Sequence, residues 1–275
     1  MNRLLTVAAI NDLSGSSRCS LTVALPVLAA MGMQCSVLPT AILSNHTGYE
    51  NYFFEDYTDN MEKFSHNWQK QNLRFDCIYS GFLGSDRQIK IVENFIADFK
   101  TDNTKVLIDP VMGDNGKIYT TYTPKMCSEM KQLASLADVI TPNITEACAL
   151  ADEEYNGEFI TEQKAHTLAE KIHSMGAKSI VITGIKSGES ISNYVYSNGE
   201  GRIFTSMITP KYYTGTGDLF ASVLCGLVTK GKDIFESVKF TTTYVHKVTE
   251  YSLNMNMHEN EGVCFEKFMR ELTEL

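Results

Sequence analysis

Residues 214–222, TGTGDLFAS, place two glycines, two threonines and an acid directly before an apolar run with helical spacing. Glycine lets a backbone approach a ligand closely, and the free N–H groups at a helix N-terminus attract anions such as phosphate. The acid, Asp218, can either cap the helix or accept a proton beside a bound anion. This stretch alone leaves both interpretations open.

Three other polar stretches follow predicted strands: NDLSGSSRCS at 11–20, DPVMGDNGKIY at 109–119 and TPNITEA at 141–147. Each has a structural alternative, since Asp109 before a proline could form a turn and Asn143 could be an N-cap. Open α/β sheets bind ligands where their strands end. Four polar strand ends on one edge therefore favour a functional site over four separate structural roles.

Short apolar runs without strict alternation predict strands that are covered on both faces. They lie at 4–10, 35–39, 75–82, 105–110, 137–142 and 179–184. Segments with helical spacing lie between them, at 19–31, 86–99, 123–134, 144–151 and 162–175. The alternation of strand and helix predicts an α/β fold with a mostly parallel central sheet.

The alternating pattern breaks in two places. Residues 50–72 are polar and aromatic and contain no predicted strand, whereas residues 193–207 predict an antiparallel pair with a turn at 198–201. After Asp218 the pattern is helical to the end of the sequence. Because no repeat, low-complexity tract or flexible linker interrupts residues 1–275, the sequence predicts a single domain.

Composition limits the classes of partner. The formal net charge of -9 disfavours broad nucleic-acid binding, which needs a basic face. The longest apolar stretch, at 21–33, contains a proline and is too short to span a bilayer. The seven cysteines are scattered without metal-binding spacing, as expected of free thiols in a reducing compartment. We therefore expect a cytoplasmic protein with no membrane partner.

One stretch resembles a phosphate-binding loop but differs from that motif at its last residue. The stretch GLVTKGKD at 226–233 has Asp233 where a phosphate loop needs a hydroxyl to hold Mg²⁺. It also ends a predicted helix instead of joining a strand to one. The sequence has no Gly-x-Ser-x-Gly motif, which disfavours a hydrolase of that type.

The stretches DPVMGD, ITPNITEA and GTGDLFAS, in this order along the chain, resemble the ribokinase superfamily, and within it the vitamin kinases. The string SNHTGY at 44–49 is similar to the substrate loop of pyridoxal kinases. The resemblance implies a ribokinase-like three-layer sandwich, with a central, mostly parallel sheet and helices on both faces. It also implies a homodimer.

The resemblance further implies transfer of the γ-phosphoryl group of ATP to a primary alcohol of a vitamin. Asp218 matches the base that takes the proton from the substrate's hydroxymethyl group. The N–H groups of Gly215, Thr216 and Gly217 match the anion hole. Oriented N–H donors suit this role, because phosphoryl transfer depends mainly on positioning and on neutralising charge.

Further site residues follow from the same resemblance. Asn143 and Glu146 match an Asn-x-x-Glu motif that positions Mg²⁺ and the ATP phosphates. Asp109 matches an acid associated with a divalent or a monovalent cation, which leaves K⁺ open as a second ion. Asp114 matches an acid near the phosphates, and Thr183 a threonine on the nucleotide side.

The vitamin pocket departs from the pyridoxal kinase pattern. Ser44 and Thr47 lie in the matching substrate loop, but Asp12 stands near a position where a serine is common. Phe82 stands where a tyrosine is expected. Asp12 follows a predicted strand closely, so we expect it to enter the pocket and to favour a protonated group of the vitamin. Whether the tyrosines at 212–213 pack on adenine or fill a lid stays open.

The leading interpretation is an ATP-dependent kinase for pyridoxal, pyridoxine or pyridoxamine. A hydroxymethylpyrimidine kinase of thiamine synthesis is the alternative enzyme, favoured by the NDLSGSS stretch and disfavoured by SNHTGY. A non-catalytic nucleotide- or vitamin-binding protein is the alternative from another class. The presence of both Asp218 and Glu146 argues against it, since a binding protein does not need a base.

Overall fold

Six parallel strands form the centre of the molecule, and their apolar side chains are buried. The computed structural model describes residues 3–120, 122–157 and 159–275. A nine-stranded sheet has the order β11-β10-β9-β8-β5-β4-β1-β2-β3. The pairs from β9 across to β2 are parallel, and the antiparallel pairs are confined to the two edges of the sheet.

The strands of the main sheet are β1 (Leu5–Ser14), β2 (Met33–Leu43), β3 (Phe54–Asp56), β4 (Cys77–Ser80), β5 (Lys105–Ile108), β8 (Val139–Ile140), β9 (Ser179–Ser187), β10 (Ser190–Ser197) and β11 (Glu200–Met207). A separate ribbon pairs β6 (Gly113–Asp114) with β7 (Lys117–Ile118). The helices are α1 (Leu21–Ala30), α2 (Thr58–Lys70), α3 (Asp86–Phe99), α4 (Pro124–Ser135), α5 (Ile144–Leu150), α6 (Glu162–Ser174), α7 (Thr216–Thr229), α8 (Ile234–Asn254) and α9 (Met269–Thr273).

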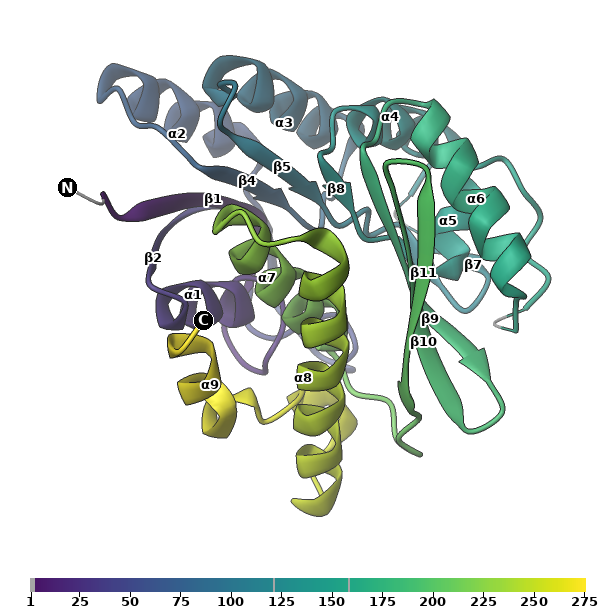
Figure 1. Cartoon of the computed structure of the whole chain (residues 1–275). Coiled ribbons are helices and arrows are strands. Elements are labelled where there is room, and N and C mark those ends of the chain that lie inside the picture. The colour runs from purple at the N-terminus through teal and green to yellow at the C-terminus, as the bar shows by residue number, and fades with distance from the viewer. Residues whose placement is uncertain (1–2, 121, 158) are drawn as a thin grey trace.

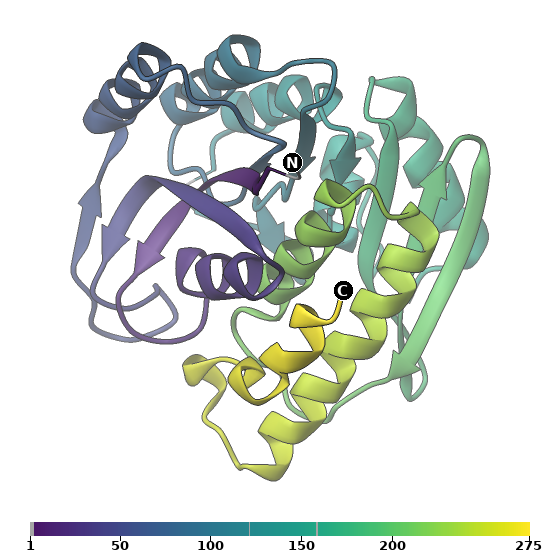
Figure 2. The same cartoon turned by 60° about the vertical axis from the view of Figure 1, so that its left-hand side comes forward.

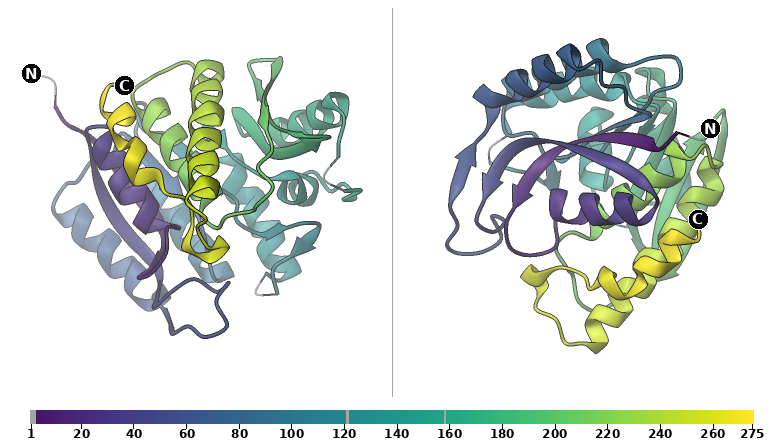
Figure 3. Two further views of the ribbon diagram at one scale, coloured as in Figure 1. Left: turned by 90° about the horizontal axis from the view of Figure 1, so that it is seen from below. Right: turned by 90° about the vertical axis from the view of Figure 1, so that its left-hand side faces the viewer.

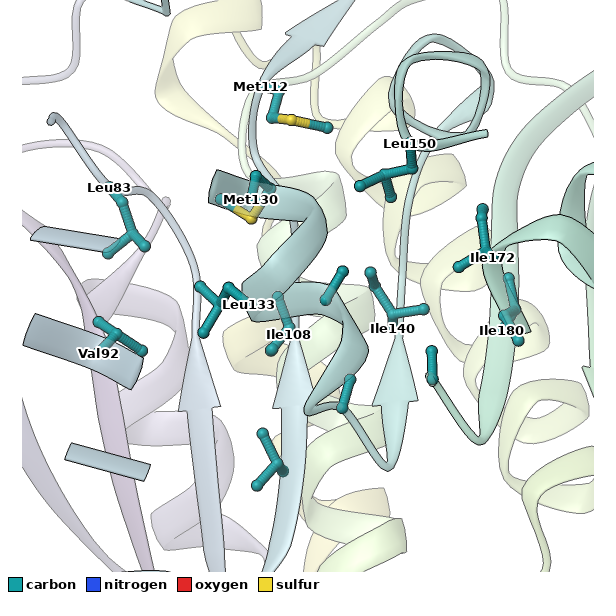
Figure 4. Packing of buried hydrophobic residues seen from close by; sticks show 14 of the residues in the cluster. Leu83, Val92, Ile108, Met112, Met130, Leu133, Ile140, Leu150, Ile172 and Ile180 are labelled. Atoms are coloured by element: carbon teal, nitrogen blue, oxygen red, sulfur yellow. The ribbon is translucent and has the colours of Figure 1, made fainter. Parts of the chain in front are cut away.

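Helices cover both faces of this sheet (Figure 1). One buried apolar cluster joins the sheet to α2, α3, α4, α5 and α6, and a second joins it to α1, α7 and α8. Figure 4 shows the first cluster, in which Leu133 and Met130 of α4 lie over the strands that carry Ile108 and Ile140. The predicted three-layer arrangement of the ribokinase-like fold is confirmed.

The C-terminal segment closes the molecule on the side of α1. After α8 the chain forms two short 3₁₀ turns, η1 (Glu259–Glu261) and η2 (Phe265–Phe268), and ends in α9. Figure 2 shows this yellow segment turning back from α8 toward α1, and the two views of Figure 3 agree. Of the helices described, none has the length and apolar character needed to cross a membrane.

The structure differs from the sequence-based prediction mainly at residues 50–72. This segment forms the edge strand β3 and the helix α2, so the prediction that it contains no strand was wrong. All three residues of β3 are exposed, which removes the apolar pattern of a buried strand. The predicted antiparallel pair is confirmed as β10 and β11, and helices follow Asp218 as expected.

Candidate active site

Asp218 lies in the first turn of α7 and does not cap it. The N-cap is Gly215, which has a left-handed conformation with φ 76°. The side chain of Asp218 is instead bonded to another element, since Asn11 Nδ2 of β1 donates to Asp218 Oδ1 at 3.4 Å. The helix-cap interpretation of Asp218 is therefore not supported.

The beginning of α7 leaves backbone donors free. Leu219 N–H donates to the carbonyl of Gly215 at 2.9 Å, whereas no described residue accepts from the N–H groups of Thr216, Gly217 or Asp218. The Thr216 hydroxyl donates back to the carbonyl of Tyr213 at 2.6 Å. A Cβ added at Gly217 would meet no described atom within 4 Å. Open space in front of free N–H groups at a helix N-terminus is a place where an anion can bind.

Asn11 is a site residue that the sequence analysis did not identify. It is 1% exposed, and its Oδ1 accepts from the N–H groups of Asp12 and Phe82, both at 2.9 Å. These two bonds orient the amide so that its Nδ2 points at Asp218. Gly81 leaves the room, because a Cβ there would overlap the Asn11 side chain. The available signal was its polar side chain directly after the apolar run at 4–10.

Asp218 has a raised proton affinity. Burial raises the pKa of Asp218 to about 6, and the nearby charge of Asp12 adds to this shift. Hydrogen bonds from the backbone of Ser20 and from Asn11 oppose the shift. A carboxylate whose pKa lies just below neutral pH is both ionised and a better proton acceptor than an ordinary aspartate.

Asp109 and Glu146 extend this acidic region. Burial, followed by repulsion from Asp218, raises the pKa of Asp109 to about 8, while the hydroxyl of Thr141 donates to Asp109 Oδ1 at 3.0 Å. Burial, followed by the charge of Asp109, raises the pKa of Glu146 well above its usual range. Neither Asp109, Asp218 nor Glu146 forms a salt bridge within the described ranges. Such repelling carboxylates attract a cation.

Glu146 has a structural role that its motif did not indicate. Its Oε1 accepts from Met112 N–H at 3.0 Å, and its Oε2 accepts from Asn143 N–H at 2.9 Å. Asn143 Oδ1 accepts in turn from Glu146 N–H at 3.0 Å, which completes a capping box at the start of α5. Because both carboxylate oxygens are engaged, this geometry fits action on a cation through water better than direct coordination.

Thr183 of β9 and Asn143, which follows β8, lie together. Thr183 forms an isolated parallel bridge with Asn143, and its N–H donates to the carbonyl of Pro142 at 2.9 Å. Asn143 Nδ2 donates to the carbonyl of Gly113 at 2.8 Å, which joins α5 to the ribbon that carries Asp114. Asp114 Oδ1 accepts from Asn115 N–H at 2.8 Å. The structure thus brings Thr183, Asn143 and the ribbon of Asp114 together.

Asp12 lies inside β1, not after it. The strand continues to Ser14, and its pairing with β2 shifts register between Asn11 and Leu13, so Asp12 stands at an irregularity that can redirect a side chain. Asp12 is 7% exposed, and Ser14 Oγ donates to its Oδ2 at 2.9 Å. Burial raises the pKa of Asp12, although hydrogen bonds from Ser20 and Ser14 oppose that shift.

The other residues expected around the vitamin lie on two loops. Phe82 follows β4, and its carbonyl accepts from the hydroxyl of Thr40 at 3.0 Å. Ser44 and Thr47 are exposed on the loop after β2. The Ser44 hydroxyl donates to Asn45 Oδ1 at 2.8 Å and accepts from Phe53 N–H at 2.9 Å, so it is used within the loop. Their contact with a vitamin stays a prediction.

Two tyrosines lie near the acids. The charges of Asp114 and Glu146 act on the hydroxyls of both Tyr119 and Tyr212. Tyr212 is 69% exposed, so its ring is open to solvent or to a ligand. Tyr213 is 1% exposed and packs in the core, which excludes it from stacking on adenine.

The acids do not form a complete metal cage. Among the residues that the structure describes, no three side chains of His, Cys, Asp or Glu are arranged to hold a metal ion. Mg²⁺ commonly takes one or two carboxylates together with waters and substrate phosphates. Asp109 has repelling carboxylates nearby and no cationic partner among the described residues, so it fits that kind of incomplete site.

Comparison with known proteins identifies the family. A model of the family described as phosphomethylpyrimidine kinase matches residues 25–263. The chain belongs to the phosphomethylpyrimidine kinase family. Its relatives and structural neighbours include pyridoxal kinases with the ribokinase-like fold, so it is a kinase of this combined group.

The similar structures have this fold almost throughout. A protein of Bacteroides thetaiotaomicron described as a "putative phosphomethylpyrimidine kinase" is 38% identical, with 98% of this chain and 94% of that chain covered and a TM-score of 0.96. A second crystal form of the Bacteroides protein contains pyridoxal; it is 37% identical, covers 98% and 96%, and has a TM-score of 0.93. A pyridoxal kinase of Lactobacillus plantarum is 26% identical, covers 99% and 98%, and has a TM-score of 0.92.

A curated relative is longer than this kinase. The thiamine biosynthetic bifunctional enzyme TH1 of Arabidopsis thaliana is 25% identical over 261 residues, which are 91% of this chain and 47% of that protein. This chain therefore spans about half of that relative's length.

Proposed function

We propose that this kinase transfers the γ-phosphoryl group of ATP to the hydroxymethyl group of pyridoxal, pyridoxine or pyridoxamine. The observation that carries the proposal is the position of Asp218, whose raised pKa accompanies free N–H groups in the same helical turn. A base beside an anion site is what phosphoryl transfer to an alcohol requires. The pyridoxal in the Bacteroides neighbour supports the substrate class.

In the proposed mechanism, Asp218 accepts the hydroxymethyl proton as the oxygen attacks the γ-phosphorus. The bond between the γ-phosphorus and the bridging oxygen breaks, and ADP leaves. The N–H groups of Thr216 and Gly217 donate to the transferring phosphoryl oxygens, where charge is greatest in the transition state. Asn11 keeps Asp218 oriented through its Nδ2.

Asp109 would hold Mg²⁺, with Glu146 acting through water and Asp114 beside the phosphates. Mg²⁺ would supply neutralisation of phosphate charge. Glu146 also stabilises this region, because its two carboxylate oxygens accept hydrogen bonds from the N–H groups of Met112 and Asn143. K⁺ near Asp109 is a further ion that we include in the proposal. Thr183 would lie on the nucleotide side.

The alternative substrate is hydroxymethylpyrimidine. The family description, phosphomethylpyrimidine kinase, and the thiamine biosynthetic relative of Arabidopsis support an acceptor of this pyrimidine class. Asp12 at the irregularity of β1, Phe82, and the loop of Ser44 and Thr47 would form the pocket that separates the two substrates. A purely binding protein would not need an oriented base at Asp218, so we place that alternative last. We further propose a cytoplasmic homodimer without nucleic-acid or membrane partners, in keeping with the net charge of -9.

The proposal is tested by ATP consumption with four acceptors: pyridoxal, pyridoxine, pyridoxamine and hydroxymethylpyrimidine. Mg²⁺ is titrated in each case, with and without K⁺. The expected result is the highest kcat/KM with one of the three vitamers. A kcat/KM that is highest for hydroxymethylpyrimidine would favour the alternative enzyme, and no phosphorylated product with any acceptor would contradict both.

A further inference from the structure

A short C-terminal turn contacts three segments of the proposed site: the loop after β1, loop 44–49 and the residues directly before α7. The turn comprises residues 258–262 and includes the 3₁₀ helix η1. It is far from these loops in sequence, and the chain reaches them by turning back from α8 (Figure 2). We call residues 258–262 the bracket turn. Neither the motifs nor the proposed mechanism gives it a role.

Three consecutive carbonyls of the bracket turn accept hydrogen bonds from three different loops. The carbonyl of Glu259 accepts from Thr214 N–H at 3.1 Å, directly before the anion-hole glycines. The carbonyl of Asn260 accepts from His46 Nε2 at 2.9 Å and from the hydroxyl of Tyr49 at 3.2 Å. The carbonyl of Glu261 accepts from Arg18 N–H at 3.3 Å, in the loop after β1.

Further hydrogen bonds join loop 44–49 to the bracket turn and to the loop after β1. Asn260 Nδ2 donates to the carbonyl of Gly48 at 3.1 Å. His46 Nδ1 accepts from Gly48 N–H at 3.1 Å while its Nε2 donates to the bracket turn, so both ring nitrogens are engaged. Ser17 Oγ also donates to the Tyr49 hydroxyl at 3.1 Å, which adds a link to the loop after β1.

The loop after β1 is packed closely between the start of α7 and the bracket turn. A Cβ at Gly215 would overlap the carbonyl oxygen of Arg18, and a Cβ at Gly262 would lie 2.7 Å from that same oxygen. The Arg18 backbone therefore lies between the anion hole and the bracket turn. Arg18 Nε also donates to Glu266 Oε1 at 2.6 Å, so movement of this loop would strain contacts on both sides.

The geometry points to the bracket turn as a positioning element that couples the vitamin loop to the anion hole. The inference rests on the proposed function. Vitamin binding that orders loop 44–49 would stabilise the bracket turn, and the Glu259 carbonyl would then hold Thr214 and the N–H groups after it. Asn260 and Tyr49 are positioning residues in this scheme, since they act through other groups.

Coupling of this kind is reciprocal and can be measured by binding alone. The probes are ADP with Mg²⁺ and pyridoxine, which together cannot react. We expect saturating pyridoxine to tighten ADP binding to the parent enzyme by about 5-fold or more, a usual size for coupling between sites. In Tyr49→Phe and Asn260→Ala we expect this factor to fall toward 1, with ADP affinity in the absence of pyridoxine unchanged.

Steady-state kinetics give a second readout. Each hydrogen bond that a variant loses should lower kcat/KM for the vitamin by roughly 2- to 12-fold. The KM for ATP, measured at a low concentration of the vitamin, should stay unchanged. Tyr251→Phe is the matched control, because Tyr251 packs on Phe268 away from these loops. A thermal melting temperature equal to that of the parent shows that each variant is folded.

Two results would overturn the inference: a parent enzyme whose ADP affinity does not respond to pyridoxine, or variants that keep the full coupling factor. Failure of the proposed function can be distinguished from failure of this inference, because in that case the parent enzyme forms no phosphorylated vitamers. Failure of the inference alone leaves a parent that phosphorylates the vitamer and variants that match Tyr251→Phe.

Discussion

The local environment of Asp218 sets the pH at which it can work. Burial of its carboxylate, together with the nearby charge of Asp12, raises the pKa of Asp218 to about 6. A base must be deprotonated, so activity limited by Asp218 falls as the pH drops through about 6. The bound cation and ATP would change this value, which makes the profile of kcat/KM the informative one.

Replacing Asp218 with Asn should lower kcat by about 10²- to 10⁴-fold, the usual cost of removing a general base. ADP affinity should stay within about twofold, because the N–H donors of α7 belong to the backbone. Isothermal titration with ADP and initial-rate assays provide the two measurements. The control is Glu236→Gln, an acid in the first turn of α8. Near-normal turnover in Asp218→Asn would contradict its assignment as the base.

Asp12 should influence which vitamer is preferred. Its carboxylate would favour a protonated ring nitrogen or the aminomethyl group of pyridoxamine, because a hydrogen bond to a charged partner is worth about 1.5–3 kcal/mol. We expect Asp12→Asn to lower kcat/KM for pyridoxamine by roughly 10- to 150-fold and to affect the neutral vitamers less. Equal, small losses with all three vitamers would leave Asp12 as a structural residue bonded to Ser14.

At the scale of elements, the two glycines at the start of α7 should behave differently. Gly217 has open space at its Cβ position, whereas Gly215 has φ 76° and would overlap Arg18. Gly217→Ala should therefore keep the melting temperature within about 2 °C but raise the KM for ATP roughly tenfold, because the methyl group enters the anion site. Gly215→Ala should lower the melting temperature through backbone strain.

The two substitutions control for each other, since each adds one methyl group to the same turn. Melting temperatures and the KM for ATP separate strain from obstruction. A large loss of stability in Gly217→Ala would contradict the open space at its Cβ position. An unchanged KM for ATP in a stable Gly217→Ala variant would show that this space is not the phosphate site.

The elements that were predicted correctly have strong local patterns. The central strands consist of apolar runs. Helix α3 was predicted from its helical spacing with the observed bounds, Asp86–Phe99, and in the structure Ser85 caps it. The strand β3 could not be predicted in this way, because its three residues are exposed and are held by pairing with β2. Met61, Phe64 and Trp68 do have helical spacing, so α2 had a signal that was missed.

The site residues divide in the same way: those in local sequence patterns were predicted, and those that depend on contacts distant in sequence were not. The motifs pointed to Asp218, Asp109 and the Asn143–Glu146 pair, because each lies in a short polar stretch that follows a strand or opens a helix. The motifs could not give pairwise geometry. The bond between Asn11 and Asp218 spans 207 positions, and the bond that Met112 N–H donates to Glu146 depends on the fold of the 109–114 segment. The bracket turn at 258–262 had no motif, since it contributes mainly backbone carbonyls.

At the scale of the whole molecule, the acidic site is costly to stability. The folded state raises the pKa of Asp109 to about 8, against an ordinary value of 3.8. Between these values the folded protein keeps a proton that the unfolded chain has released. The free energy of unfolding therefore falls as the pH rises from about 4 to about 8. A cation bound beside the ionised carboxylate would offset this loss.

Asp109→Asn should remove much of that pH dependence. The amide can still accept from Thr141 through its Oδ1 but carries no charge, so we expect the melting temperature at pH 8 to rise by about 2–4 °C, as about 1 kcal/mol would produce in a domain of this size. Mg²⁺ with ADP should raise the melting temperature of the parent more than that of the variant, and the variant should lose turnover. Asp98→Asn, at an exposed position of α3, is the control. Equal pH dependence of melting in parent and Asp109→Asn between pH 5 and pH 8 would contradict the account, because it would mean that Asp109 holds no extra proton in the folded state.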